Sequence, residues 1–301
     1  MYRGTWHGLT VAIKVLGSTS LQGLREFSRE VDLLQKYRHQ HLVPLLGFCL
    51  AEGEGGQKQA FLVYPMMLGG ALSDALSDAA RRLLLPAAAR LRVAADVAAG
   101  LQYLHAPGCG LPSILHRDIK SSNVLLDEAL RARISDVGFA RPMTQEATMT
   151  MGVGTWGYID PNYISTGEYG PESDIFSLGV ILLELLTGAP ASDPTLRPPH
   201  LYARMQARLD PSSGAVGAVA VADGDAGWTE LKGGRLAAVS ELAKVAIECV
   251  KATVAERPRT DQVCGRKILM TIFLTIFFTY FIWQYYSEFK MNYRVSSQQT
   301  E

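Results

Sequence analysis

"HRDIKSSNVLLD", residues 116–127, places an acid, a cation and an amide in one short segment: Asp118, Lys120 and Asn123. An aspartate can orient a hydroxyl nucleophile and accept its proton, and a lysine can neutralise a transferring phosphoryl group. The amide oxygen of an asparagine is a hard ligand of the kind that Mg²⁺ takes alongside phosphate and water. The segment therefore points to phosphoryl transfer from a nucleotide.

Asp136, in the sequence DVG at 136–138, supplies a second hard oxygen ligand after a short strand-like piece. Near the start of the chain, VAIK at 11–14 ends an apolar, β-branched run with a lone lysine, Lys14. A lysine in a half-buried strand needs a negative partner, because an unpaired buried charge is costly. We expect nucleotide phosphates to be that partner, with Glu30 holding Lys14 in place as an ion pair.

The composition excludes several classes of protein. The chain has 301 residues, of which 48% are hydrophobic and 19% charged, and its formal net charge is zero. This length is enough for two lobes with a sizeable core. The neutral balance argues against nucleic acid as the main partner, because nucleic-acid-binding proteins usually carry a basic face. The four cysteines form no Cys-x-x-Cys pair, which favours a reduced intracellular chain over a disulfide framework or a zinc site.

Hydrophobic periodicity predicts a small β-rich lobe followed by a larger helical one. The first part is expected to hold strands at 9–16, 43–49 and 60–66 and a helix at 21–37. The second part is expected to hold short strands at 124–126 and 132–135 and helices at 87–105, 173–188, 237–250 and 260–286, with a loop at 210–234. In the helix at 173–188 we expect Ser173 as the N-cap and Gly188 just after the last turn.

Six motifs stand in the order and spacing of a protein kinase domain, which the chain therefore resembles. They are VAIK (11–14), HRDIKSSNVLLD (116–127), DVG (136–138), GTWGYIDPNY (154–163), SDIFSLGVILLELLTG (173–188) and ERP (256–258). Three segments, HLVPLLGFC, FLVYPMM and GTWGYIDPNY, resemble sequences of the receptor-like and Pelle/interleukin-1-receptor-associated branch, which is Ser/Thr-specific. The resemblance implies an α+β, two-lobed kinase fold, with an incomplete N-lobe and hinge at 1–67 and a larger C-lobe at 68–265.

The resemblance also implies roles for the residues of the two polar motifs. Asp118 would be the catalytic base, Lys120 the cation on the phosphate side, and Asn123 and Asp136 the metal ligands. Asp174 resembles a buried aspartate that braces the catalytic loop. ATP and Mg²⁺ would be the cofactors, and protein hydroxyls the substrates.

The nucleotide would lie between the two lobes. By the resemblance, Lys14, paired with Glu30, contacts the α- and β-phosphates. The residues implied around adenine are the apolar pair Ala12 and Leu125, the gatekeeper Tyr64, and the hinge backbone from Pro65 to Met67.

Arg117, beside the catalytic aspartate, is the residue that receives a phosphate from the activation loop in such kinases. Three threonines are candidates for that phosphate: Thr144, Thr148 and Thr150. Thr150 is best placed, since it lies five residues before Thr155, which matches the family's substrate-side threonine. An activating kinase or an upstream receptor would then be a partner.

Three departures from the family pattern bear on activity. Met1 occupies the position of the valine that ends the Gly-rich loop, so we expect weak Mg-ATP binding and slow turnover for this sequence as it stands. Val137 replaces the phenylalanine of Asp-Phe-Gly, which we expect to loosen the packing behind Asp136. Asn162 replaces a glutamate and would offer Arg257 only a neutral hydrogen bond.

Residues 268–287 contain no charged side chain and follow Arg266 and Lys267. Such a segment is long enough to cross a bilayer core of about 30 Å as one helix. We therefore expect a transmembrane helix at 266–287, a tail at 288–301, and a cytoplasmic kinase domain attached to the membrane through 268–286. Two alternatives stay open, a buried soluble helix and sequence unrelated to the domain, because the composition shifts abruptly here.

Two classes of function remain open at this point. One is an active Ser/Thr protein kinase that transfers the γ-phosphate of ATP to protein hydroxyls. The other is an incomplete, kinase-like binding module that signals by protein contact. The complete set of polar catalytic residues favours the enzyme, and the lack of a Gly-rich loop in the sequence favours the module.

Overall fold

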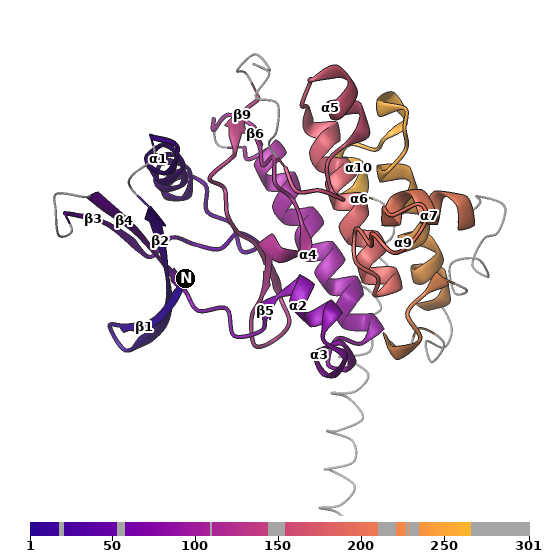
Figure 1. The fold of residues 1–301 in the computed structure, drawn as a ribbon, viewed down its shortest axis with the longest axis horizontal. Coiled ribbons are helices and arrows are strands. Elements are labelled where there is room, and N and C mark those ends of the chain that lie inside the picture. Colours follow the sequence, from indigo (N-terminus) through magenta and orange to yellow (C-terminus); the bar gives the residue numbers. More distant parts are fainter. Residues whose placement is uncertain are drawn as a thin grey trace, which may run out of the picture.

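The computed structural model describes residues 1–17, 21–52, 58–108, 110–143, 154–209, 221–226, 228 and 235–265. Figure 1 shows a sheet and one helix on one side of the molecule and a larger group of helices on the other. The expected α+β fold with a small β-rich lobe and a larger helical lobe is confirmed.

The small lobe is an antiparallel four-stranded sheet with the order β1-β2-β4-β3. Its elements are β1 (Tyr2–Trp6), β2 (Leu9–Gly17), β3 (Gly47–Glu52), β4 (Lys58–Pro65) and the helix α1 (Leu21–Lys36). The register pairs Ala12 with Tyr64 and Lys14 with Leu62. Paired residues and alternate residues of a strand share a face. The sheet therefore presents Ala12, Lys14 and Tyr64 on one side.

Helix α1 turns an acid inward together with its apolar side chains. Phe27, Val31 and Leu34 are buried, as their helical spacing predicts. Glu30 lies within the same buried stripe, with only 1% of its surface exposed. The helix thereby carries a carboxylate to the inner side of the small lobe.

The strand expected at 43–49 begins later than predicted, at Gly47. The preceding residues pair with the large lobe instead. The backbone N–H of Val43 donates to the carbonyl of Ile134 at 2.9 Å, and that of Ile134 donates to the carbonyl of His41 at 2.8 Å. This segment therefore fastens the two lobes together and is not free to extend β3.

The large lobe is built around α6 (Pro171–Thr187), in which every residue from Ser173 to Leu186 is buried. The surrounding elements are α2 (Leu72–Ser77), α3 (Ala79–Leu83), α4 (Ala87–His105), α5 (Pro161–Thr166), α7 (Leu201–Arg208), α9 (Arg235–Cys249) and α10 (Thr260–Gly265). The expected N-cap was wrong: Gly170 is the N-cap, because Pro171 fits the first helical position, where no N–H is needed. Gly188 ends the helix in the left-handed conformation, as expected.

Short strands place the polar motifs at the junction of the lobes. The strand β7 (Val124–Leu126) lies between β5 (Gly70–Ala71) and β8 (Ala132–Ile134), and β6 (Ile114–Leu115) pairs with β9 (Arg141–Pro142). The segment 116–123 connects β6 to β7, and Asp136 follows β8 directly.

Within the described part of the chain, no helix combines the length and apolar character needed to cross a membrane. The helix predicted at 260–286 is described only as α10, which runs to Gly265. The transmembrane expectation for 266–287 therefore falls on residues outside the described ranges, as does most of the loop expected at 210–234.

Candidate active site

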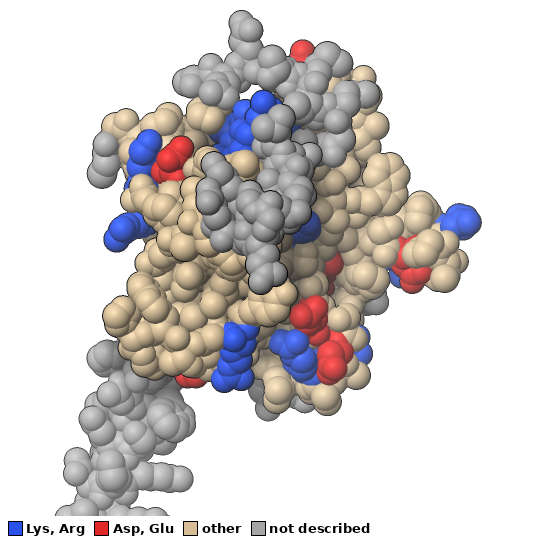
Figure 2. All heavy atoms as spheres, turned by 60° about the vertical axis from the view of Figure 1, so that its left-hand side comes forward, with Lys and Arg blue, Asp and Glu red and all other residues tan. Residues whose placement is uncertain are grey.

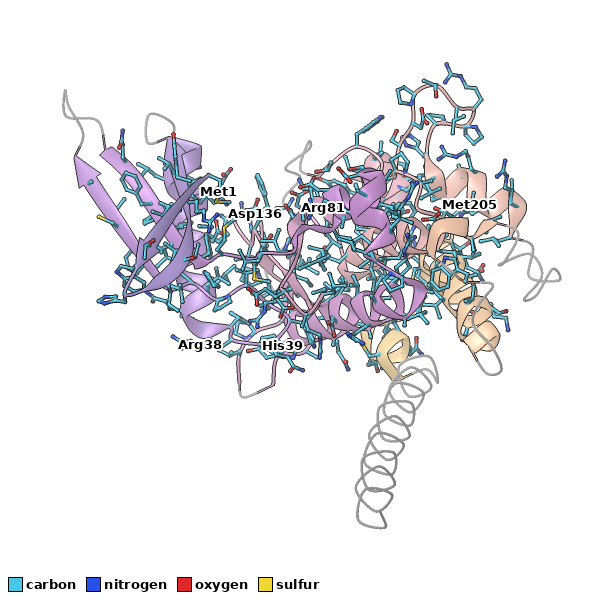
Figure 3. The ribbon with its side chains drawn as sticks, turned by 90° about the horizontal axis from the view of Figure 1, so that it is seen from below. Met1, Arg38, His39, Arg81, Asp136 and Met205 are labelled. Carbon is cyan, nitrogen blue, oxygen red and sulfur yellow. The ribbon has the colours of Figure 1, made fainter. Side chains whose placement is uncertain are left out.

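A cavity of about 280 Å³ opens between the lobes. Its lining includes every residue expected at the nucleotide and the metal: Ala12, Lys14, Glu30, Tyr64, Pro65, Met67, Asn123, Leu125 and Asp136. Met1 also lines this cavity, and Figure 3 shows Met1 and Asp136 close to each other where the two lobes meet. The cavity has an apolar wall and a charged end, as a nucleotide requires.

Lys14 joins three elements through two ion pairs at the charged end. Its Nζ lies 3.0 Å from Glu30 Oε2 on α1 and 2.8 Å from Asp136 Oδ1 after β8. Burial lowers the pKa of Lys14, but the two carboxylates outweigh it and hold the pKa above its ordinary value. Burial likewise raises the pKa of Asp136, and Lys14 outweighs it so that the pKa lies below its usual range. Both groups are therefore charged at neutral pH.

Tyr64 contributes a hydrogen bond as well as an apolar surface. Its hydroxyl donates to Glu30 Oε1 at 2.5 Å, while Glu30 Oε2 accepts from Lys14. Both carboxylate oxygens of Glu30 are thus held by the residues facing the cavity. This fixes the orientation of α1 against β2 and β4.

Asp118 lies at the centre of a second hydrogen-bond network. Thr155 Oγ1 donates to Asp118 Oδ1 at 2.8 Å, and Lys120 Nζ lies 2.7 Å from Asp118 Oδ2 and 2.8 Å from Thr155 Oγ1. Asn123 Nδ2 donates to the Asp118 carbonyl at 2.9 Å and to its Oδ2 at 3.1 Å. The carboxylate is therefore oriented by three side chains, which is what a positioned proton acceptor needs.

The fit of a cation was tested on the donor set. Among the described residues, no group of three or more His, Cys, Asp or Glu side chains is placed to hold a metal ion. Asn123 uses its amide nitrogen for both bonds to Asp118, so its amide oxygen is the atom with which it would bind a cation. Two protein oxygens, from Asn123 and Asp136, fit Mg²⁺, because this ion is usually completed by phosphate and water.

Asp174 on α6 braces the segment that carries Asp118. Its carboxylate accepts from the backbone N–H of His116 at 2.8 Å and of Arg117 at 3.0 Å, and from Tyr169 Oη at 2.6 Å. His105 Nε2 lies 2.9 Å away. Arg117 has a left-handed backbone with φ of 72°, a conformation that costs a non-glycine residue about 1–3 kcal/mol. The hydrogen bonds to Asp174 hold this conformation in place.

Glu184 is a site residue that the motif analysis missed. It is buried in α6 and accepts from Tyr158 Oη at 2.8 Å and from Ser121 Oγ at 3.2 Å. Glu184 therefore connects the segment after Lys120 with the segment after Thr155. It is the one charged residue between Asp174 and the end of that apolar helix, and this isolation is the signal that could have identified it.

A model of the protein kinase domain matches residues 2–267 of the chain. The chain belongs to the protein kinase family. Among curated proteins it is 44% identical over 194 residues to a nodulation receptor kinase of Pisum sativum, covering 62% of this chain and 20% of that protein. It is 36% identical over 261 residues to calcium/calmodulin-regulated receptor-like kinase 1 of Arabidopsis thaliana, covering 83% and 53%.

A probable LRR receptor-like serine/threonine-protein kinase of Arabidopsis thaliana is 39% identical over 204 residues, covering 67% of this chain and 22% of that protein. The kinase domain thus spans about a fifth to a half of the length of these relatives. The receptor-like side of the resemblance is confirmed, and its Pelle side stays a prediction.

Arginines from three separate segments, Arg29, Arg117 and Arg141, lie close enough for their charges to act on Arg29. Arg29 on α1 donates to the carbonyl of Gly138 at 3.1 Å. Burial, followed by the nearby charges of Arg141 and Arg117, lowers the pKa of Arg29. Figure 2 shows Lys and Arg side chains gathered at the top of the face that it presents, the end at which α1 and β9 lie in Figure 1. This concentration of positive charge suits an anion.

The structure adds detail at two of the expected departures. Val137 is buried, with 2% exposure, and belongs to the hydrophobic core, while the looser packing expected behind Asp136 stays a prediction. Arg257 pairs with an acid, Asp160, at 2.6 and 2.8 Å, and a hydrogen bond between Asn162 and Arg257 is not among the described contacts. The acid lies two residues earlier than the family pattern places it.

Glu184 makes the stability of the kinase domain depend on pH. Burial raises the pKa of its carboxyl from 4.5 to about 7. The folded state therefore favours the protonated form, and the stability that this form provides is lost as pH rises from about 4.5 to about 7. Glu184→Gln should abolish this pH-dependent loss of stability, which amounts to about 3 kcal/mol at 1.36 kcal/mol per pKa unit.

Urea unfolding at several pH values between about 5 and 8 checks this expectation. The matched control is Glu241→Gln on α9, a partly exposed acid beside Lys244. Parallel stability profiles for wild type and Glu184→Gln would contradict the role of Glu184.

Proposed function

We propose that this kinase domain transfers the γ-phosphate of ATP to Ser or Thr hydroxyls of protein substrates. The observation that carries the proposal is the network of Asp118, Lys120 and Thr155, which is connected to the cavity through Asn123. Its support from the comparisons is the kinase family and relatives named as serine/threonine-protein kinases.

Residues of both lobes would bind and orient the nucleotide. Ala12 and Leu125 offer apolar surfaces to adenine, and Lys14 presents a fixed positive charge to the phosphates. Magnesium held by Asn123 and Asp136 would supply further positive charge to the transferring group. Positioning and electrostatic stabilisation are most of the catalysis in phosphoryl transfer.

Asp118 would act on the substrate hydroxyl. Its carboxylate accepts a hydrogen bond from that hydroxyl, aims the oxygen at the γ-phosphorus and receives the proton. A new O–P bond forms while the bond between the γ-phosphorus and the bridging oxygen breaks, and ADP leaves. Lys120, held between Asp118 and Thr155, neutralises negative charge on the transferring group.

Asp118→Asn should reduce phosphate transfer to a generic Ser/Thr peptide by at least about 100-fold, because the proton acceptor is lost. Its melting temperature should stay close to that of wild type, since asparagine keeps the shape of the side chain and the change removes no side chain of the hydrophobic core. Radiolabel transfer and thermal unfolding provide the two measurements.

Asp261→Asn is the matched control, because Asp261 is half exposed, pairs with Arg259, and like Arg259 does not line the cavity. Undiminished transfer by Asp118→Asn would refute the assignment of the base. A wild-type chain that binds ATP and transfers no phosphate would favour the contact-signalling module instead.

We also propose that a phosphorylated threonine of the activation loop binds the arginines around Arg117. The candidates Thr144, Thr148 and Thr150 lie outside the described residues. Support comes from Arg29, whose pKa is lowered first by burial and then by the nearby charges of Arg141 and Arg117. A phosphate carries about −1.5 to −2 charge and forms strong hydrogen bonds to guanidinium groups.

Thr150→Ala should lower the activity of the phosphorylated kinase by about tenfold, which corresponds to roughly 1.4 kcal/mol of lost interaction. Arg141→Gln should cause a similar loss and should add little to Thr150→Ala. Transfer rates before and after phosphatase treatment check both. Additive losses in the double variant would show that the two residues act independently.

Membrane attachment through 268–286 is the remaining proposal, and its support is the uncharged sequence itself. The whole chain, expressed in cells, should remain in the pellet after carbonate extraction. A chain shortened to residues 1–265 should move to the supernatant. Release of the whole chain into the supernatant would reject the anchor.

A further inference from the structure

Asp160 and Arg257 form a buried ion pair between segments 97 residues apart. Arg257 Nη1 lies 2.6 Å from Asp160 Oδ2, and Nη2 lies 2.8 Å from Oδ1. Asp160 is 1% exposed and Arg257 6% exposed. This two-point geometry fixes direction as well as distance, because the guanidinium and the carboxylate are both planar.

Both partners are fastened to further elements. Asp160 caps α5 by accepting from the backbone N–H of Asn162 at 2.9 Å, and it accepts from Ser173 Oγ on α6 at 3.1 Å. Arg257 donates to the carbonyls of Glu172 at 3.1 Å and of Lys251 at 2.8 Å. The pair therefore joins the start of α5, the first turn of α6 and the segment before α10.

This junction is connected to the hydrogen-bond network of Asp118 through two segments. Ser173 precedes Asp174, which holds the backbone immediately before Asp118. Thr155, five residues before Asp160, donates to Asp118 Oδ1. The segment 155–160 is thus attached at one end to Asp118 and at the other to the helix that positions Asp118.

We propose that Asp160 is the positioning residue that sets Thr155 against Asp118, and that in this chain it takes the place of the missing acid at position 162. The proposal rests on the proposed function, since Thr155 matters for transfer only if Asp118 does. Asn162 has other contacts: its N–H donates to Asp160, and its carbonyl accepts from Ser165 and Thr166. The ion pair of Arg257 is made by Asp160 alone among the described contacts.

Burial of an ion pair is weak evidence for stability, because the desolvation of two charges offsets much of their attraction. The effect of this pair is better explained by the orientation that it gives to the Asp160 carboxylate. Two parallel hydrogen bonds and two further donors, Ser173 and the N–H of Asn162, leave the Asp160 carboxylate one orientation. Because only four residues separate Thr155 from Asp160, the fixed orientation of Asp160 also limits the positions that Thr155 can take.

Asp160→Asn tests the proposal, because it keeps the shape and the helix cap and removes the charge. We expect kcat/KM for a Ser/Thr peptide to fall at least about tenfold, while the affinity for a fluorescent ATP analogue stays within about twofold. Hydrogen exchange of backbone amides in 155–166 should become faster. Asp160→Asn combined with Asn162→Glu should recover much of the lost kcat/KM and much of the slow hydrogen exchange, since an acid on the first turn of α5 can then pair with Arg257.

Asp261→Asn, which removes an acid from an exposed pair with Arg259, is the matched control and should change none of the three measurements. Normal peptide kinetics in Asp160→Asn would overturn the proposal. The proposal would also be overturned if Asp160→Asn lost nucleotide binding and thermal stability along with peptide phosphorylation, and if Asn162→Glu did not recover them. That pattern would indicate general destabilisation.

If Asp160→Asn does not fold, the double variant decides the question. A folded double variant with slow exchange in 155–166 supports the proposal, and one with fast exchange overturns it. If the wild-type chain transfers no phosphate, the proposed function fails. The hydrogen-exchange comparison still decides whether Asp160 fixes the segment.

Discussion

One carboxylate, that of Asp174, sets the geometry on which the rest of the site depends. It is fully buried in the most apolar helix of the domain, where an unpaired charge could not persist. Backbone amides of His116 and Arg117 satisfy it, and in return they are held in a conformation that the chain would otherwise avoid. The position of Asp118 follows directly, because it is the next residue along the chain.

Buried charges also stabilise one another at the junction of the lobes. Lys14 is stable there because Glu30 and Asp136 flank it, and neither acid would be placed inward without the lysine. Each of the three comes from a different element. An incoming polyanion meets a positive charge whose position is already fixed, so little ordering remains to be done on binding.

The sequence allowed Asp118, Lys120 and Asn123 to be grouped, because they lie within one short segment. Asp136 lies in a separate motif, and its place beside them was an expectation from the resemblance. Lys14 and Glu30 could be paired because one charge in a strand and one on a helix both needed a partner. Arg29 and Arg141 could not be grouped in this way. They belong to a helix and a strand far apart in the chain, and nothing local requires either to face the other.

Asp160 shows more clearly what could not be predicted from the sequence. The family pattern places the acid at 162, and the sequence offers an acid two residues earlier that reads equally well as a helix cap. Only the fold shows that one carboxylate serves both purposes. The late start of β3 has a similar cause. The carbonyl of His41 and the N–H of Val43 bond to Ile134 in the other lobe, and strand propensity cannot predict this contact.

Tyr64 has a consequence for selective inhibition. Its ring lines the cavity, and its hydroxyl donates to Glu30. A compound that occupies the space of this ring has to displace a large aromatic side chain and leave the Glu30 oxygen without its donor. Compact inhibitors that leave the ring in place avoid both penalties. Selective compounds therefore gain their shape complementarity from the other residues that line the cavity.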